Sequence, residues 1–204
     1  MTNAHDKKDT LGGRLQRPSN MLSSMVTSFR QVLIRHGLTM LTALALLLLA
    51  LLLPAYEFGI DYQILIPSRP LPVFVYLGAG VLMMAFAAGF WRIRGAPIDA
   101  RLWAWLVYLL AISVIEEIAF RVFAPILLDH VFAPRMSVLF SNALFAGLHY
   151  FTLRWRLSNC VWVFLGGLGL ARLFHETGDL ALIIGVHWLA TFLNTPTPPS
   201  GRRT

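Results

Sequence analysis

Apolar stretches long enough to cross a lipid bilayer alternate along this chain with short polar segments. Six such stretches cover residues 38–53, 72–91, 102–123, 136–153, 157–174 and 180–194. About 20 residues of helix cross a hydrocarbon core roughly 30 Å thick. The pattern therefore predicts an all-α fold, a polytopic integral membrane bundle of about six transmembrane helices, forming a single transmembrane domain over residues 37–195.

The segments at the two ends of the chain do not fit this apolar pattern. Residues 1–19 are polar and include Gly12, Gly13 and Pro18, so we expect a flexible cytosolic tail there and another at residues 196–204. Over residues 20–36, apolar residues recur every three or four positions, which is typical of an amphipathic helix. Two interpretations remain for this helix: it lies on the inner membrane surface, or it extends the first span into the cytosol.

The composition also indicates a membrane protein. Of the 204 residues, 57% are hydrophobic and 13% are charged, whereas about 25% of the residues in a soluble domain are charged. The single cysteine, Cys160, excludes a disulfide framework and a multi-cysteine metal site, and we expect it to be a packing residue. Glycines that would let helix backbones approach closely recur in two spans: Gly78, Gly80, Gly89, Gly166, Gly167 and Gly169.

Basic residues are concentrated on one side of the predicted spans. With the N-terminus inside, all of the 17 lysines and arginines fall in cytoplasmic segments except Arg69, Arg121, Arg135 and Arg172. Cytoplasmic loops of membrane proteins carry such an excess. The net charge of +7 therefore indicates membrane orientation rather than a nucleic-acid partner. We expect both termini in the cytoplasm and, given the short loops, a bacterial cytoplasmic (inner) membrane.

Three ionisable residues lie inside the apolar span 102–123. Charged groups there cost roughly 2.5–3.5 kcal/mol each on insertion scales, so they normally face a polar interior and mark function. Glu117 and Arg121 are one helical turn apart and can pair along one face, either as a structural lock or as part of a site. Glu116 points away from that face and has no partner on its own helix, which makes it a candidate general base.

Two later spans each carry a stripe of polar and aromatic side chains at helical spacing. The stripes consist of Asn142, Phe145 and His149 in span 136–153, and of His187, Thr191 and Asn194 in span 180–194. One buried histidine is more often structural than catalytic. Two of them, together with a glutamate pair on a third span, are best accommodated around one interior cavity. His5 and His36 fall before the spans, and we assign them to the tail or the membrane interface.

These residues also carry a resemblance. Glu116, Glu117 and Arg121 match the EExxxR motif of the CAAX protease and bacteriocin-processing (CPBP) family of intramembrane proteases, and Phe145 with His149 matches its FxxxH motif. His187 falls where the last motif of that family is expected. The resemblance covers residues 102–194. One departure is Thr191, which stands where the family usually has Asn or Asp.

The resemblance implies specific roles for these residues. Glu116 and His149 would activate a water molecule, and His187 with Thr191 or Asn194 would stabilise the oxyanion. Glu117 and Arg121 would then orient the catalytic groups, with Phe145 and Asn142 as supporting residues. We expect no cofactor. The alternative is a zinc ion held by Glu116, His149 and His187, because two histidines and a carboxylate can bind zinc with an open water position.

The leading hypothesis is thus an intramembrane CAAX-type endopeptidase of the glutamate type. Its substrate would be a membrane-associated, prenylated or exported peptide or protein, reached within the lipid bilayer. The alternative is a catalytically silent membrane partner of the same family, acting in immunity or sensor regulation, which the departure at Thr191 keeps open. A proton pathway is disfavoured, because the polar groups form one cluster instead of a chain across the membrane.

Overall fold

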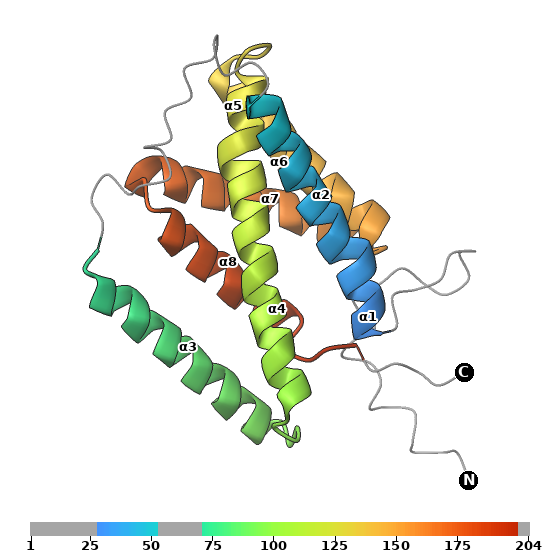
Figure 1. Ribbon diagram of the computed structural model, residues 1–204, viewed down its shortest axis with the longest axis vertical. Coiled ribbons are helices and arrows are strands. Elements are labelled where there is room, and N and C mark those ends of the chain that lie inside the picture. The colour runs from blue at the N-terminus through green and yellow to red at the C-terminus, as the bar shows by residue number, and fades with distance from the viewer. Residues whose placement is uncertain (1–27, 53–70, 200–204) are drawn as a thin grey trace.

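The computed structural model describes residues 28–52 and 71–199, and these residues form helices and no strand (Figure 1). The first helix runs through α1 (Phe29–Val32), η1 (Leu33–Gly37) and α2 (Leu38–Leu52), and the second is α3 (Val73–Ile93). The third runs through α4 (Ala100–Glu117), η3 (Ile118–Phe123) and α5 (Ala124–Leu128). The last three are α6 (Pro134–Thr152), α7 (Leu157–Thr177) and α8 (Leu180–Asn194). The predicted all-α bundle is confirmed.

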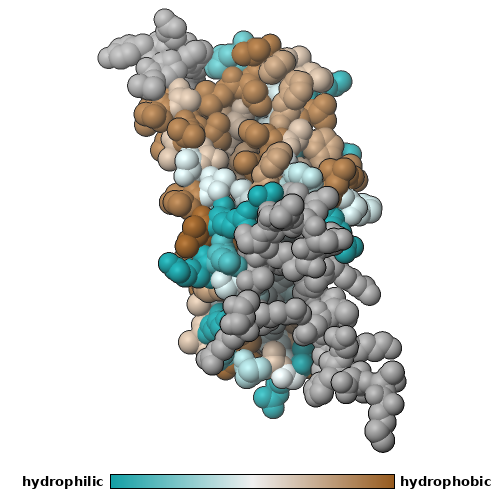
Figure 2. All heavy atoms as spheres, turned by 90° about the vertical axis from the view of Figure 1, so that its right-hand side faces the viewer, coloured by the Kyte–Doolittle hydropathy of each residue, from teal (hydrophilic) through white to brown (hydrophobic). Residues whose placement is uncertain are grey.

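The surface of the bundle is that of an integral membrane protein. Three described helices are long and apolar enough to cross a membrane, Phe29–Leu52, Val73–Ile93 and Leu157–Thr177, and Leu180–Asn194 is a shorter apolar helix. Large apolar side chains on α2 and α3, such as Leu46, Phe74 and Leu82, are exposed. On the face that carries α2 and α6, hydrophobic side chains cover the upper half (Figure 2). Such a surface favours lipid over water.

The first helix begins sharply at Phe29. Ser28 caps it, because its hydroxyl oxygen accepts from the Gln31 backbone N–H at 3.3 Å and its own N–H donates to Gln31 Oε1 at 3.2 Å. From there the helix continues without a break into the first span. For the described part of residues 20–36, this agrees with the second interpretation, in which the helix extends the first span. The predicted tail at residues 1–19, the first part of the predicted amphipathic helix at residues 20–27, and residues 200–204 of the predicted C-terminal tail lie outside the described residues.

Helix α4 runs through the middle of the bundle and packs against α2 and α8, while α6 packs against α7 (Figure 1). At one end, the segment after α8 is held against this core by its backbone carbonyls. Trp105 Nε1 donates to the Thr195 oxygen and Trp91 Nε1 to the Pro196 oxygen, each at 2.7 Å. Residue 195 and residues 196–199, the start of the predicted C-terminal tail, therefore pack on the bundle.

Two of the helices contain a π-helical stretch, and both stretches adjoin the same buried polar groups. η1 contains His36, and η3 begins directly after Glu116 and Glu117. A π turn inserts an extra residue, which rotates the side chains and leaves backbone groups in need of partners; such turns are frequent at functional sites. In η3 the Phe120 carbonyl accepts a hydrogen bond from the Ser141 hydroxyl of α6 at 2.6 Å.

Candidate active site

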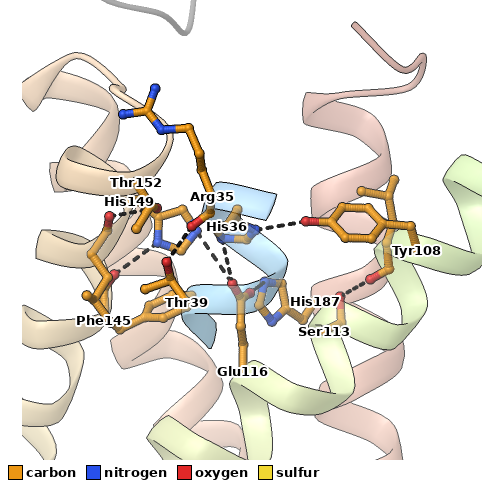
Figure 3. A network of polar contacts seen from close by, with 12 residues as sticks. Arg35, His36, Thr39, Tyr108, Ser113, Glu116, Phe145, His149, Thr152 and His187 are labelled. Carbon is orange, nitrogen blue, oxygen red and sulfur yellow. Dashed lines mark hydrogen bonds and ion pairs between the residues drawn. The ribbon is translucent and has the colours of Figure 1, made fainter. Parts of the chain in front are cut away.

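Four helices bring their ionisable side chains to one point inside the bundle (Figure 3). Glu116 and Glu117 come from α4, His149 from α6 and His187 from α8, as the sequence analysis expected. His36, from the first helix, joins them. All five side chains are buried. Groups of this kind are stable in an apolar interior only when they find partners in one another.

The Glu116 carboxylate lies among three imidazole rings. Its Oε1 atom is 3.0 Å from His36 Nε2 and 3.8 Å from His149 Nε2, and its Oε2 atom is 3.4 Å from His187 Nε2. The partner that Glu116 lacks on its own helix is therefore supplied by three others. Every one of these contacts reaches the carboxylate through the Nε2 atom of the ring.

Glu117 points about 100° away from Glu116 around α4 and forms the ion pair that its spacing from Arg121 predicts. Its Oε2 atom is 3.3 Å from Arg121 Nε, and its Oε1 atom is 2.6 Å from His187 Nδ1. The Arg121 guanidinium also lies over the Phe145 ring, with Cζ 4.5 Å from the ring centroid. Glu117 thus links the arginine of its own helix to the histidine of the last one.

The ring of His149 is oriented by its own helix. Its Nδ1 atom lies 2.9 Å from the backbone oxygen of Phe145, one turn earlier. A carbonyl oxygen can only accept, so Nδ1 carries the hydrogen and, in the neutral ring, Nε2 is left as an acceptor. Nε2 of His149 and Oε1 of Glu116, 3.8 Å apart, are therefore two acceptors that face each other.

Asn142 of α6 is buried and lies close to Gly167 of α7. Its amide nitrogen donates to the Val138 oxygen at 2.8 Å. A Cβ atom at Gly167 would lie 2.2 Å from Asn142 Oδ1 and 2.9 Å from Arg121 Nη2, so a side chain there would force Asn142 or Arg121 to shift. Of the glycines expected to allow close helix approach, Gly167 alone does so: a Cβ at Gly78, Gly80, Gly89, Gly166 or Gly169 would meet nothing within 4 Å.

The site opens into a cavity of about 1100 Å³. Glu116, His149 and His187 line it together with Thr191 and Asn194, and apolar and aromatic side chains of α3, α4, α6 and α7 form much of the remaining wall. Thr191 is half-buried and Asn194 is exposed. Both residues that could assist His187 therefore border the same space as the catalytic candidates.

A comparison with family models identifies the part of the chain that carries both glutamates, His149 and His187. Residues 97–193 match the family described as type II CAAX prenyl endopeptidase Rce1-like. This segment is Rce1-like. The match confirms the resemblance to the CPBP family over residues 102–194, and the kind of function that it supports is that of a CAAX-type intramembrane protease. Comparisons with curated proteins and with solved structures found no match.

His36 precedes the Rce1-like segment, and the prediction for this residue was wrong. It is not a tail or interface residue, because the helix around it is continuous with α2 and turns its ring into the bundle, where 5% of the residue is exposed. Gly37, the next residue, faces Tyr108 of α4: a Cβ there would lie 3.4 Å from Tyr108 Cε2, in van der Waals contact. The signal in the sequence that could have placed His36 in the site is a histidine followed by glycine just before an apolar span.

The described ligand atoms also include a set that could hold a metal ion. His36, Glu116 and His149 each offer one ligand atom, and these atoms all lie within 4.8 Å of one another. The remaining ring nitrogens of both histidines contact fixed partners, Tyr108 Oη and the Phe145 carbonyl oxygen, as is usual for metal-ligating histidines. The donor set fits zinc. The zinc-binding set expected from the sequence had His187 in place of His36. The Nδ1 atom of His187 contacts Glu117.

Proposed function

We propose that the protein is an intramembrane endopeptidase in which Glu116 and His149 activate a water molecule. The observation that carries this proposal is the pair of facing acceptors, Glu116 Oε1 and His149 Nε2, buried 3.8 Å apart at the wall of a large cavity. A water molecule has two hydrogens to donate and would satisfy both atoms. A lone pair of the water oxygen would then face the cavity, where a peptide carbonyl can enter.

The chemistry follows from this placement. As the water oxygen bonds to the carbonyl carbon, Glu116 accepts one of its protons, and the carbonyl π electrons move to the oxygen to give the tetrahedral oxyanion. When the carbon–nitrogen bond breaks, Glu116 returns the proton to the leaving amine. The products are a carboxylic acid terminus, which keeps the second water proton until it ionises in solvent, and an amine terminus. His149 accepts the second hydrogen bond of the water and so fixes its direction of attack.

His187 is the proposed donor to the oxyanion. Both of its ring nitrogens face carboxylate oxygens, Glu117 Oε1 at 2.6 Å and Glu116 Oε2 at 3.4 Å. This arrangement is satisfied when both nitrogens carry hydrogen. The shorter bond fixes the ring, and the longer one can be exchanged for the developing oxyanion. Thr191, one turn along α8 and on the same cavity, is the second proposed donor.

We expect the reaction to need no metal. A zinc ion, if bound, would be held by His36, Glu116 and His149 and would supply a more acidic water at the same position. Purified protein that retains stoichiometric zinc and loses cleavage to a chelator would contradict the metal-free proposal.

The proposed substrate is a peptide or protein that is membrane-associated, prenylated or exported. The apolar and aromatic walls of the cavity suit a lipid-linked or hydrophobic segment next to the scissile bond. The bilayer itself is the second partner. We propose a bacterial cytoplasmic membrane as the location, with both termini in the cytoplasm, from the distribution of lysine and arginine.

The test compares the termini of membrane and secreted proteins by mass spectrometry in cells that express the native chain or Glu116→Gln at equal levels. Glu176→Gln is the matched control, because it removes an exposed carboxylate of α7 outside the cavity lining. We expect at least one new terminus with the native chain and the control that is missing with Glu116→Gln. Identical termini in all three cultures would contradict proteolysis.

A catalytically silent partner is the second candidate, and Thr191 is the observation that favours it, since it replaces the usual Asn or Asp. In that case the phenotype of the native chain would survive Glu116→Gln. If the protein is a protease, Glu116→Gln should abolish both the phenotype and the new terminus.

A further inference from the structure

We propose that His36 is a positioning residue of this active site, which acts with Tyr108 to hold the Glu116 carboxylate in place for water activation. The inference rests on the proposed protease function and extends it. His36 belongs to none of the motifs and lies outside the Rce1-like segment, residues 97–193. The first helix would thus contribute directly to the chemistry.

The contacts of His36 are those of a residue built into the site. Its Nε2 atom, 3.0 Å from Glu116 Oε1, is closer to this carboxylate than either His149 or His187 is. Its ring packs edge-on against His149, with centroids 5.1 Å apart. His36 therefore touches both members of the proposed water-activating pair, as Figure 3 shows.

The hydrogen positions on His36 follow from its two neighbours. Tyr108 Oη lies 3.1 Å from His36 Nδ1, and a phenol can donate its hydrogen to that nitrogen. Nε2 then carries the ring hydrogen and faces the carboxylate oxygen. The other neutral tautomer would set the lone pairs of Nε2 and Glu116 Oε1 against each other at 3.0 Å.

His36 and His149 consequently play opposite parts at the same oxygen. His149 donates from Nδ1 to the Phe145 carbonyl and presents a bare Nε2, whereas His36 presents an N–H. In the proposed arrangement the ring N–H of His36, whose Nε2 lies 3.0 Å away, would engage one lone pair of Glu116 Oε1 and leave the other for a water that also bonds to His149. Holding the carboxylate in this rotation is the contribution we assign to His36.

The fold provides for this role at the level of the backbone. The π turn η1 carries His36, and the next residue, Gly37, lies against Tyr108 of α4, since a Cβ there would be 3.4 Å from Tyr108 Cε2. A residue that only filled space at this point would not need a polar ring between two polar partners, because a leucine would pack there without desolvation cost.

A bound metal would require the opposite arrangement. If His36 ligated an ion through Nε2, its hydrogen would sit on Nδ1 and point to the oxygen of Tyr108. The hydrogen-bonding role and the metal-binding role of His36 therefore differ in which ring nitrogen carries the hydrogen. They also differ in the effect of His36→Gln, because a glutamine amide can donate a hydrogen bond but is a poor zinc ligand.

The kinetic test uses the full chain purified in detergent and an internally quenched, farnesylated peptide that ends in a CAAX sequence. We expect His36→Ala to lower kcat about 10- to 100-fold, as for loss of a hydrogen bond to a charged group, with KM unchanged. His36→Gln should recover most of kcat, and Tyr108→Phe should lower it less than His36→Ala does. His175→Gln, an exposed histidine of α7, is the control and should match the native chain.

Two kinetic results would overturn the inference. One is full activity in His36→Ala. The other is equal inactivity of His36→Gln and His36→Ala together with loss of bound zinc from both, which would make His36 a metal ligand.

A second measurement does not depend on activity. In 15N-histidine NMR of the native chain, the ring signals that disappear in His36→Gln should show a protonated Nε2 and an unprotonated Nδ1. The reverse tautomer would overturn the proposed hydrogen-bond relay. If the peptide were not cleaved but the expected tautomer were seen, the protease proposal would fail for this substrate, and the arrangement at His36 would stand.

Discussion

His187 Nδ1 lies 2.6 Å from Glu117 Oε1, a shorter contact than any between Glu116 and the three histidines around it. The same carboxylate pairs with Arg121. Glu117 therefore holds together the third and last helices, whereas Glu116 faces the cavity. Two adjacent glutamates on one helix have separate tasks, because consecutive side chains on a helix point about 100° apart.

The first prediction separates these two tasks. Glu116→Gln should lower cleavage of the farnesylated peptide about 10²- to 10⁴-fold, the usual contribution of a general base, without lowering the unfolding temperature in detergent. Glu117→Gln should lower both cleavage and the unfolding temperature, because it leaves Arg121 buried without its carboxylate. Equal unfolding temperatures for the two variants would contradict this division.

Arg121→Met tests the cost of breaking the buried pair. Removing one partner of such a pair typically costs about 3–5 kcal/mol, because the other charge is left uncompensated. Arg172→Met is the matched control: Arg172 pairs with Glu176 at the same one-turn spacing, but both side chains are exposed, so we expect no measurable loss. Reversible denaturation in detergent gives both values, and similar losses would contradict the importance of burial.

Gly167→Ala should destabilise the protein by about 1–3 kcal/mol, the usual cost of overpacking, because the new Cβ would overlap Asn142 and approach Arg121. Gly166→Ala, one residue earlier on the same helix, meets nothing within 4 Å. It should be neutral or stabilising by up to about 1 kcal/mol through helix propensity. The unfolding midpoints of the two variants provide the comparison, and identical midpoints would contradict the close approach of α7.

Ser141→Ala tests the support of the π turn after the glutamates. The Ser141 hydroxyl donates to the Phe120 carbonyl of another helix at 2.6 Å, and losing such a bond leaves a buried carbonyl short of a donor, at a cost of about 1–3 kcal/mol. Ser113→Ala is the control, since the Ser113 hydroxyl donates to Leu109 of its own helix. We expect the first variant alone to lower both stability and kcat. A loss in Ser113→Ala as large as that in Ser141→Ala would argue against a special role for the π turn.

Thr191→Val and Asn194→Ala ask which residue assists His187. Thr191 is one turn from His187 and half-buried, whereas Asn194 is exposed. We therefore expect Thr191→Val to lower kcat by about 10², as for one oxyanion donor, and Asn194→Ala to have little effect. Thr191→Asn should retain activity. A loss confined to Asn194→Ala would transfer the role to that residue.

Local spacing accounts for the parts of the site that could be predicted. Glu117 and Arg121 are four residues apart on one helix, so their pairing follows from helical geometry alone. His149 and His187 came from motifs. The contact of His36 with Tyr108 joins residues 72 positions apart. Helical periodicity predicts only contacts within one helix, so it could not predict this one. The expectation that several glycines allow close packing failed for the same reason, since only the neighbouring helix decides which glycine is needed.

From the sequence one can predict that the chain forms apolar helices, that the buried glutamates need partners and that two histidines lie at helical positions able to provide them. Only the packed bundle shows that a third histidine, His36, comes closest to Glu116 and that a side chain at Gly167 would overlap its neighbours. The physical reason is that hydrophobicity and spacing act along one helix. Which faces meet depends on how each helix is rotated against its neighbours, and here two π turns change that rotation beside the site.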